Sequence, residues 1–305
     1  MNKRAAVFSC LGLGDGLISL VLSNNLKLNG FDVTTYHPSL ASLQKWFPGL
    51  PILPFPSLGE LARFDSLFLF FEKSLQMQAV IQECQAHFPE RTRILNPIAT
   101  SNRDYPFWEG GRFDGRTPFA ENLVRFCKER LGFSRLTKEC GIVVPEGVAK
   151  RAFPRRVVIH PAGSRLGKEW LPKRYDELAA VLQARGWEPA FVMSPNERAP
   201  WLHQQPPALA SLGDLAAFVA SSSAMIGNDS GVGHLASALG LPTLTLCRSK
   251  QAGAFWRPCW SRGFVLYPPS YIPNLKGVRL RDRYWKELIS VRRVLNAFLE
   301  LLTRA

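Results

Sequence analysis

The chain has 305 residues, of which 46% are hydrophobic and 20% charged, and this composition is typical of a soluble globular protein with room for two domains. It excludes a disordered or fibrous chain, and the lack of any uninterrupted run of 18 apolar residues argues against a transmembrane helix. The formal net charge of +14 lies mainly in residues 151–305, which carry 21 Lys and Arg against 10 Asp and Glu.

The first half of the chain alternates strand and helix patterns. An apolar strand at residues 4–9 ends in a Gly-rich turn at 12–16, and residues 17–28 then repeat apolar side chains at helical spacing. Further strands are expected near 31–36, 52–53, 66–71 and 93–95, and further helices near 40–47, 74–87 and 118–131. Because strands that alternate with helices form parallel sheets, the pattern predicts an α/β fold.

A second alternating series follows a region without periodicity. Residues 134–156 contain Pro145, Gly147 and Pro154, so the interdomain linker is expected there, between domains at 1–150 and 151–305. Residues 100–116 form a long loop of the kind that is often functional. The second series has strands near 156–160, 188–193, 224–226 and 243–247, and helices near 172–185, 197–203, 212–221, 232–239 and 282–302. Two doubly wound domains would place a cleft between the carboxyl ends of their sheets.

Two features bear on the compartment. The start of the chain imitates a signal peptide, but Asp15 and its flanking glycines interrupt the apolar stretch, so a folded first strand is expected. The six cysteines are widely and irregularly spaced, which suits scattered reduced thiols better than a disulfide framework or a zinc site. A cytoplasmic protein without a bound metal or cofactor is therefore expected.

The turn at residues 227–231 is the strongest candidate for a ligand site. It combines glycines with Asp229 and Ser230 directly before a helix, where free N–H groups and the helix dipole favour a phosphate or diphosphate. An ordinary strand-to-helix turn capped by Asp229 or Ser230 is the alternative. Lys168 follows another predicted strand and would add a cation to the same edge, unless it is only a surface charge.

Several other polar residues have two interpretations each. Asp15 is either a general base that takes a proton from an attacking hydroxyl or the N-cap of the following helix. Glu197 either binds ribose hydroxyls or complements a helix dipole. His160 and His234 are more often structural, although His234 lies one turn into the motif helix and would reach bound phosphates.

Basic and aromatic residues are interleaved near the C-terminus. Residues 248–293 contain eleven Lys and Arg, only two acids and eight aromatic residues. Such a surface suits nucleic acid, anionic lipid head groups or a phosphorylated substrate. No nucleic-acid-binding motif is present, so nucleic acid is not an expected partner, and a solvated basic face without any partner is the remaining alternative.

Four blocks along the chain together resemble the ADP-heptose:lipopolysaccharide heptosyltransferases, glycosyltransferase family 9. Residues 12–16 resemble the family's Gly-Asp turn, and 159–172 its His-Pro-Gly-Ala block with a Lys-x-Trp-Pro end. Residues 194–198 resemble the segment with a ribose-binding Glu, and 227–242 the Asn-Asp-Ser-Gly block. The blocks occur in the family's order over most of the chain, which makes the resemblance more specific than any single motif.

The resemblance implies a GT-B fold, in which two Rossmann-like doubly wound domains face a central cleft. It implies an inverting, metal-independent transfer of heptose from ADP-heptose to an anionic glycolipid acceptor, with peripheral contact at the inner face of a membrane. Asp15 would be the base and Lys168 would hold the donor phosphates, while Gly14 and Gly16 would lie at the acceptor. The other implied donor-binding residues are Ser164, Glu197, Asp229, Ser230, Gly231, Gly233 and His234.

The sequence departs from the family's pattern at two places. Val232 and Gly233 replace a Pro-Met pair, and Cys247-Arg-Ser-Lys250 stands where members have a Phe/Tyr-Gly-Pro-Thr turn. The second change falls in the donor pocket that the resemblance implies. Transfer from another sugar nucleotide, or to a protein or different glycan, therefore stays open, as does a binding protein without turnover. The terminal helix is expected to belong to the second domain or to cross back to the first.

Overall fold

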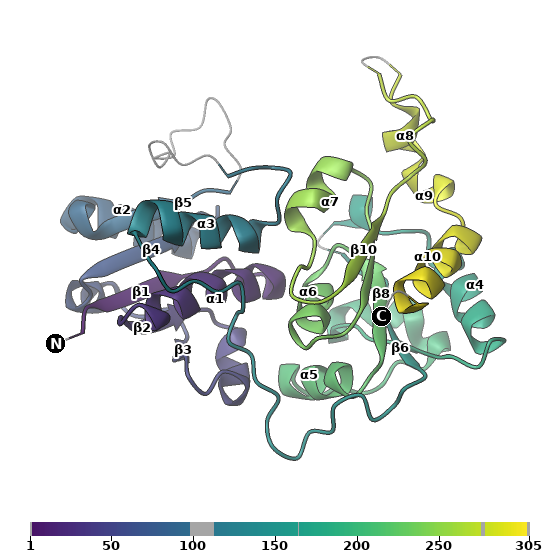
Figure 1. Ribbon diagram of the computed structural model, residues 1–305, viewed down its shortest axis with the longest axis horizontal. Coiled ribbons are helices and arrows are strands. Elements are labelled where there is room, and N and C mark those ends of the chain that lie inside the picture. Colours follow the sequence, from purple (N-terminus) through teal and green to yellow (C-terminus); the bar gives the residue numbers. More distant parts are fainter. Residues whose placement is uncertain (1, 98–112, 164, 276–277, 304–305) are drawn as a thin grey trace. The chain divides into compact units, whose positions relative to one another are not determined.

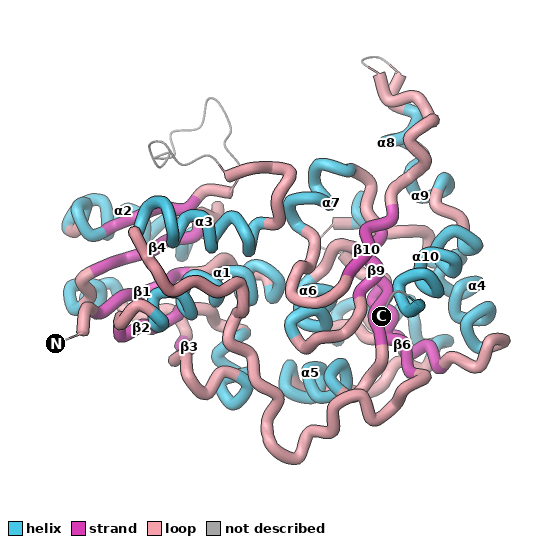
Figure 2. Tube along the Cα trace, viewed as in Figure 1, coloured by secondary structure: helices cyan, strands magenta, loops and turns pink. Residues whose placement is uncertain are grey.

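A computed structural model describes residues 2–97, 113–163, 165–275 and 278–303 of the chain. Its contacts divide the chain into two compact units, Met1–Val143 and Val144–Ala305. The boundary falls inside a stretch, residues 132–155, that has neither helix nor strand. Each unit is an open α/β sheet covered by helices (Figures 1 and 2). Within the described ranges, no helix is both long enough and apolar enough to cross a membrane.

The sheet of the first unit is parallel throughout, with the order β3-β2-β1-β4-β5. Since the chain passes from β1 to β2 on one side and later to β4 on the other, the sheet reverses its winding at the carboxyl ends of β1 and β4. Ligands of open α/β sheets bind at such a point. The strands are β1 (Arg4–Phe8), β2 (Asp32–Tyr36), β3 (Ile52–Leu53), β4 (Ser66–Phe70) and β5 (Thr92–Leu95).

Helices bury both faces of this sheet, which explains its nearly continuous apolar strands. On one face, Leu67 and Leu69 of β4 pack with Met77 of α2. On the other, Phe68 and Phe70 meet aromatic rings of α3 edge to face. The helices are α1 (Leu13–Leu28), α2 (Leu75–His87) and α3 (Phe119–Leu131), and the 3-10 helices are η1 (Leu40–Trp46), η2 (Leu58–Arg63) and η3 (Pro89–Arg91).

The second unit repeats this architecture with the strand order β10-β9-β8-β6-β7, again all parallel. Its winding reverses between β6 and β8, so the carboxyl ends of these two strands form the equivalent point. The strands are β6 (Arg156–His160), β7 (Glu188–Phe191), β8 (Ala224–Asn228), β9 (Thr243–Leu246) and β10 (Gly263–Leu266). The expected α/β fold of two doubly wound domains is thereby confirmed.

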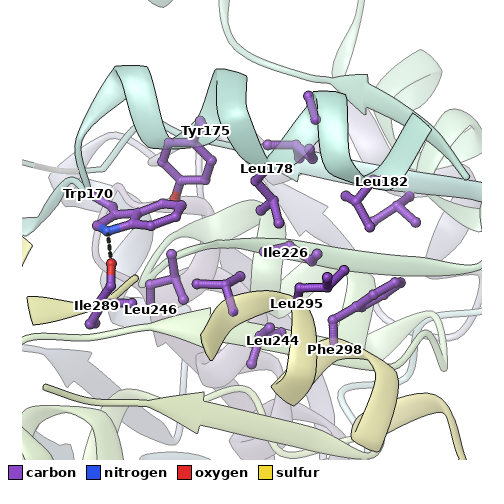
Figure 3. Packing of buried hydrophobic residues seen from close by; sticks show 14 of the residues in the cluster. Trp170, Tyr175, Leu178, Leu182, Ile226, Leu244, Leu246, Ile289, Leu295 and Phe298 are labelled. Atoms are coloured by element: carbon purple, nitrogen blue, oxygen red, sulfur yellow. Dashed lines mark hydrogen bonds between the residues drawn. The ribbon is translucent and has the colours of Figure 1, made fainter. Parts of the chain in front are cut away.

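Two layers of helices also cover this second sheet. Figure 3 shows one layer, in which Tyr175, Leu178 and Phe298 of the covering helices pack with Ile226 and Leu246 of the sheet. On the opposite face, α5 and α6 pack through a smaller apolar cluster. The helices are α4 (Pro172–Gln183), α5 (Leu212–Ala220), α6 (Gly231–Ala238), α7 (Lys250–Trp256), α8 (Leu280–Arg283), α9 (Trp285–Leu288), α10 (Val291–Thr303), η4 (Leu166–Lys168), η5 (Pro195–Glu197) and η6 (Ala199–Gln204).

The prediction of a single long helix at residues 282–302 is wrong. Three helices, α8, α9 and α10, occupy this region. Tyr284 is not helical and separates α8 from α9, whereas Ile289 is extended and separates α9 from α10. The carbonyl of Ile289 accepts hydrogen bonds from Trp170 Nε1 at 3.0 Å and Arg174 Nη1 at 2.6 Å, and the Arg293 N–H donates to Ser290 Oγ at 3.4 Å. The final helix α10 packs against α4, β9 and β10 of its own unit. Strand β10 and helix α7 were not predicted.

Candidate functional site

Asn228 joins the two loops that meet where the second sheet reverses its winding. This residue ends β8 and is buried. Its Oδ1 accepts the Trp170 N–H at 3.1 Å, and its Nδ2 donates to the carbonyl of Pro161. Both ends of the amide therefore fasten the loop after β6. Sequence reasoning gave Asn228 no separate role, although it is the residue that fixes the loop carrying Lys168.

Lys168 and Asp229 form an ion pair across these loops. Lys168 Nζ lies 3.2 Å from Asp229 Oδ2, and the two side chains are 46% and 15% exposed. Exposed pairs of this kind contribute little to stability because water screens them. A phosphate that entered here would meet the ammonium group without breaking a strong internal contact. The structure thus brings together two residues that the sequence predicted at one site.

Helix α6 begins directly after Asp229. Ser230 is its N-cap, and the Ser230 hydroxyl oxygen is buried without a hydrogen-bond partner in the described part of the chain. The first N–H groups of a helix lack intrahelical acceptors, so those at Gly231 and Val232 add donors beside this hydroxyl. A Cβ at Gly233 would make only ordinary contacts, 3.6 Å from Met225 Cε, so packing does not demand glycine there.

The two histidines near the site are buried and uncharged at neutral pH. Burial lowers the pKa of His234, against the opposing effects of Asp229 and the Trp256 carbonyl. Burial also lowers the pKa of His160, whose Nδ1 donates to the Val192 carbonyl at 2.7 Å. That bond gives His160 a structural role between the ends of β6 and the residues after β7.

A pocket of about 210 Å³ lies beside the ion pair. Three cationic side chains and one carboxylate line it, which suits a compact anion with several negative charges. Sequence reasoning identified Lys168 and Asp229 but missed Arg165 and Arg248, whose signal was their position after strands β6 and β9. The lining residues are Arg165, Gly167, Lys168, Asp229, Leu246, Cys247, Arg248, Ser249 and Ala252.

Glu197, another predicted donor residue, has a local structural role. Glu197 Oε2 accepts both the N–H of Ser194 at 2.9 Å and its hydroxyl at 2.8 Å, which closes a capping box at η5. Glu197 is not among the residues that line the pocket. Ser164 lies outside the described residues, as does most of the loop predicted at 100–116.

Asp15 lies at the point where the first sheet reverses its winding. It is the third residue of α1 and is half-buried, and a Cβ on the N-cap residue Gly12 would come within 2.4 Å of Asp15 Oδ2. A second carboxylate is nearby, since Glu72 Oε2 accepts the Leu11 N–H at 2.7 Å. Burial, followed by the charges of Asp15 and Glu72, raises the pKa of the Cys10 thiol far above its ordinary range.

A buried histidine supports the turn that holds Asp15. His37 Nδ1 accepts the Leu40 N–H at 3.1 Å, so the ring proton is on Nε2, which donates to the Gly12 carbonyl at 3.2 Å. A Cβ at Gly16 would lie 2.6 Å from His37 Cδ2. Packing against His37 therefore explains the glycine at 16, which was predicted, together with the buried Gly14, as acceptor-binding. Sequence reasoning missed His37.

No group of three or more His, Cys, Asp or Glu side chains is arranged to hold a metal ion within the described ranges. The residues that could hold a charged ligand are instead the cations of the pocket and the start of α6. This arrangement provides fixed positive charge at two parallel-strand ends, and that chemistry stabilises a departing phosphate or diphosphate.

Known proteins share the fold, and part of the chain matches a family model. Residues 145–264 match the model of glycosyltransferase family 9 (heptosyltransferase). A family 9 glycosyl transferase from Veillonella parvula has 17% identity and a TM-score of 0.73, with 100% of this chain and 99% of that chain covered. ADP-heptose lps heptosyltransferase II of E. coli has 16% identity and a TM-score of 0.68, with 99% of each chain covered.

E. coli heptosyltransferase WaaC with ADP is also similar, at 15% identity and a TM-score of 0.65, with 98% of this chain and 100% of that chain covered. No curated protein matches the sequence. The family match and the shared fold confirm the expected resemblance and the GT-B fold class. The match over residues 145–264, together with the shared fold, supports a glycosyltransferase.

Proposed function

We propose that this glycosyltransferase moves a heptose from ADP-heptose to a lipopolysaccharide core or a related anionic glycolipid, with inversion and without a metal ion. The observation that carries the proposal is the Lys168–Asp229 pair, which lies beside a cationic pocket at the start of α6. This site falls within the residues that match the heptosyltransferase family model. The names of two E. coli heptosyltransferase structures of the same fold include ADP-heptose or ADP.

On the donor side, the chain supplies positive charge for the leaving group. Lys168, the Ser230 hydroxyl and the N–H groups of Gly231 and Val232 stabilise the diphosphate as its bond to the anomeric carbon breaks. The Gly233 N–H, also predicted to bind the donor, instead donates to the Ser230 carbonyl at 3.1 Å. Arg165 and Arg248 extend this positive field along the pocket. Asp229 holds Lys168 in place before the donor binds.

Three further residues complete the proposed donor site. Neutral His234, the fourth residue of α6, is buried against the Trp260 ring and adds no charge to the site. In this proposal the Glu197 carboxylate keeps one oxygen for a ribose hydroxyl, since the capping box uses only Oε2. Ser164 contributes a hydroxyl to the donor.

On the acceptor side, Asp15 takes the proton from the attacking hydroxyl. The resulting oxygen attacks the anomeric carbon from the face opposite the diphosphate, so the new bond forms with inverted configuration. The turn at Gly14 and Gly16 lies beside the acceptor. The reaction takes place at the inner face of a membrane, where the acceptor lipid is anchored.

An Asp15→Asn variant tests the role of the base. We expect kcat to fall by about 10²-fold or more while ADP affinity stays unchanged, because the amide cannot accept the proton. The assay is transfer from ADP-heptose to a lipopolysaccharide-core acceptor, with product followed by mass spectrometry. Glu121→Gln, which alters a carboxylate in the first turn of α3, is the matched control. Near wild-type turnover by a folded Asp15→Asn variant would remove Asp15 from the mechanism.

A second candidate function is transfer from a different sugar nucleotide. It is favoured by the Cys247-Arg-Ser-Lys250 segment, which departs from the family pattern and places Arg248 and Ser249 in the pocket lining. A thermal-shift screen of ADP-, UDP- and GDP-sugars separates the two functions. If only UDP- or GDP-sugars stabilise the protein, the donor is one of these and not ADP-heptose.

A further inference from the structure

A folded arm projects from the second unit between β10 and α9. We call the described residues 268–275 and 278–284 the arm; it includes α8 and extends away from the sheet and its covering helices (Figures 1 and 2). Leu275 and Val278 exchange two backbone hydrogen bonds of 3.1 and 2.9 Å, as a hairpin does. Arg281 donates from its N–H to the Pro273 carbonyl and from Nη1 to the Ser270 carbonyl, both at 3.2 Å.

Exposed apolar side chains are concentrated on this arm. Of the thirteen large hydrophobic side chains that are exposed in the described part of the chain, five belong to it, and Tyr271 and Leu275 reach 82% and 71% exposure. Single exposed apolar residues are ordinary, but five within a short projecting segment need a partner to cover them. The five are Tyr271, Leu275, Val278, Leu280 and Tyr284.

The same arm is positively charged. Arg279, Arg281 and Arg283 lie on it, against a single acid, Asp282. The Arg283 guanidinium lies 5.4 Å from the centre of the Tyr284 ring, which keeps an aromatic and a cationic group side by side. Apolar and aromatic side chains next to arginines fit the boundary between lipid head groups and acyl chains, where cations meet anionic phosphates.

A bilayer fits this surface better than a protein does. Stable protein interfaces use about 20–30 residues on each side, and the whole arm is smaller than that. The apolar residues of the arm lie on and beside the hairpin and α8, and the arm projects from the unit. A fluid bilayer can therefore surround these side chains. The excess of arginine also complements an anionic membrane by charge.

The base of the arm is fastened to the loop that carries Lys168. Trp285, which follows the arm, is buried, and its Nε1 donates to the Gly167 carbonyl at 3.2 Å. Lys286 Nζ donates to the Leu166 carbonyl at 2.8 Å. A membrane bound by the arm would therefore have a fixed position relative to the donor pocket of the same unit.

We propose that the arm is a docking element for anionic lipid bilayers, in which Leu275 and Val278 enter the head-group region while Arg279 and Arg283 bind lipid phosphates. The inference rests on the proposed function for its purpose, which is to bring the enzyme to a lipid-linked acceptor. Its test does not depend on turnover, because vesicle binding is measured without donor or acceptor.

The experiment is flotation of the full chain with vesicles of phosphatidylcholine alone or mixed with phosphatidylglycerol, at low and high salt. We expect binding only to the anionic vesicles and weaker binding at high salt. Two independent variants, Leu275→Ser/Val278→Ser and Arg279→Gln/Arg283→Gln, each lose about tenfold or more of this binding. Arg281 is left unchanged because it holds the hairpin together.

Matched controls remove equivalent groups elsewhere. Leu75→Ser/Leu202→Ser removes two exposed leucines outside the arm, and Lys173→Gln/Arg185→Gln removes two exposed cations of the same unit. Both controls keep wild-type vesicle binding. Wild-type binding by folded arm variants, or an equal loss in the controls, would overturn the inference.

Two further results separate this inference from its alternatives. Dissociation of a dimer by the arm variants in sedimentation velocity, with vesicle binding unchanged, would overturn it in favour of self-association. Vesicle binding that depends on the arm in a protein without turnover on any sugar nucleotide would support the inference while contradicting the proposed function.

Discussion

Two neighbouring polar residues at the end of β8 differ in what they bond to. Both ends of the Asn228 amide are hydrogen-bonded, to the Trp170 N–H and the Pro161 carbonyl, so it holds the loop after β6. The Ser230 hydroxyl is buried without a hydrogen-bond partner in the described ranges. A buried polar atom without a partner is costly, and a ligand that accepts its hydrogen bond would remove that cost.

Changing these two residues separately distinguishes support from binding. We expect Ser230→Ala not to lower the free energy of unfolding, because no internal hydrogen bond is lost and a buried hydroxyl without a partner is removed. The same variant binds ADP about tenfold more weakly. Asn228→Ala costs about 2 kcal/mol or more, because it leaves two buried groups unpaired. Urea denaturation and calorimetric titration with ADP measure both quantities.

The Ser230 assignment fails if Ser230→Ala binds ADP as tightly as the wild type does. It also fails if this substitution destabilises the fold as much as Asn228→Ala, since the hydroxyl would then have a structural role.

Single residues were predictable where a motif defines their surroundings. Lys168 and Asp229 each follow a strand, at positions where the motifs predict a phosphate site, and the two side chains form an ion pair. The capping box of Glu197 was also readable, because Ser194 precedes it by three residues, yet sequence reasoning passed over it. His37 was not predictable, since only the fold brings its ring to the turn at Gly12.

At the scale of elements, local periodicity located most strands and helices but misjudged the C-terminal region. The apolar spacing of residues 282–302 is helical, but tertiary hydrogen bonds to Ile289 favour an extended residue at that point. No local pattern contains this information, because the donors, Trp170 and Arg174, are more than a hundred residues away. Packing thus overrides propensity there.

The contact between α9 and η4 couples the base of the arm to the donor loop. We expect Lys286→Met to raise the KM for the donor by several-fold with little change in kcat, because the Leu166 carbonyl loses its donor and the loop with Lys168 is held less firmly. Steady-state kinetics with a water-soluble acceptor measure both constants. Lys173→Met, at an exposed position on α4, is the control.

The coupling would be contradicted by an unchanged donor KM in Lys286→Met. Loss of kcat without a change in KM would also contradict it, because a loop that positions the donor phosphates acts on donor binding.

At the scale of the whole molecule, the doubling of the fold followed from the sequence. Two series of alternating strands and helices, separated by a region rich in Pro and Gly, predicted two doubly wound domains, and each unit has its own sheet and core. The arm was not predicted as a separate feature. Its basic and aromatic residues were visible in the sequence, but their exposure on a projecting hairpin follows only from the structure.

The central claim is that the carboxyl edge of the second sheet binds the diphosphate of a sugar nucleotide. Calorimetric titration of the full chain with ADP and AMP, on wild type, Lys168→Ala and the control Lys173→Ala, tests it most directly. We expect wild type and control to bind ADP more tightly than AMP, and Lys168→Ala to bind ADP about tenfold or more weakly than wild type. Equal ADP affinity in Lys168→Ala and wild type would contradict it.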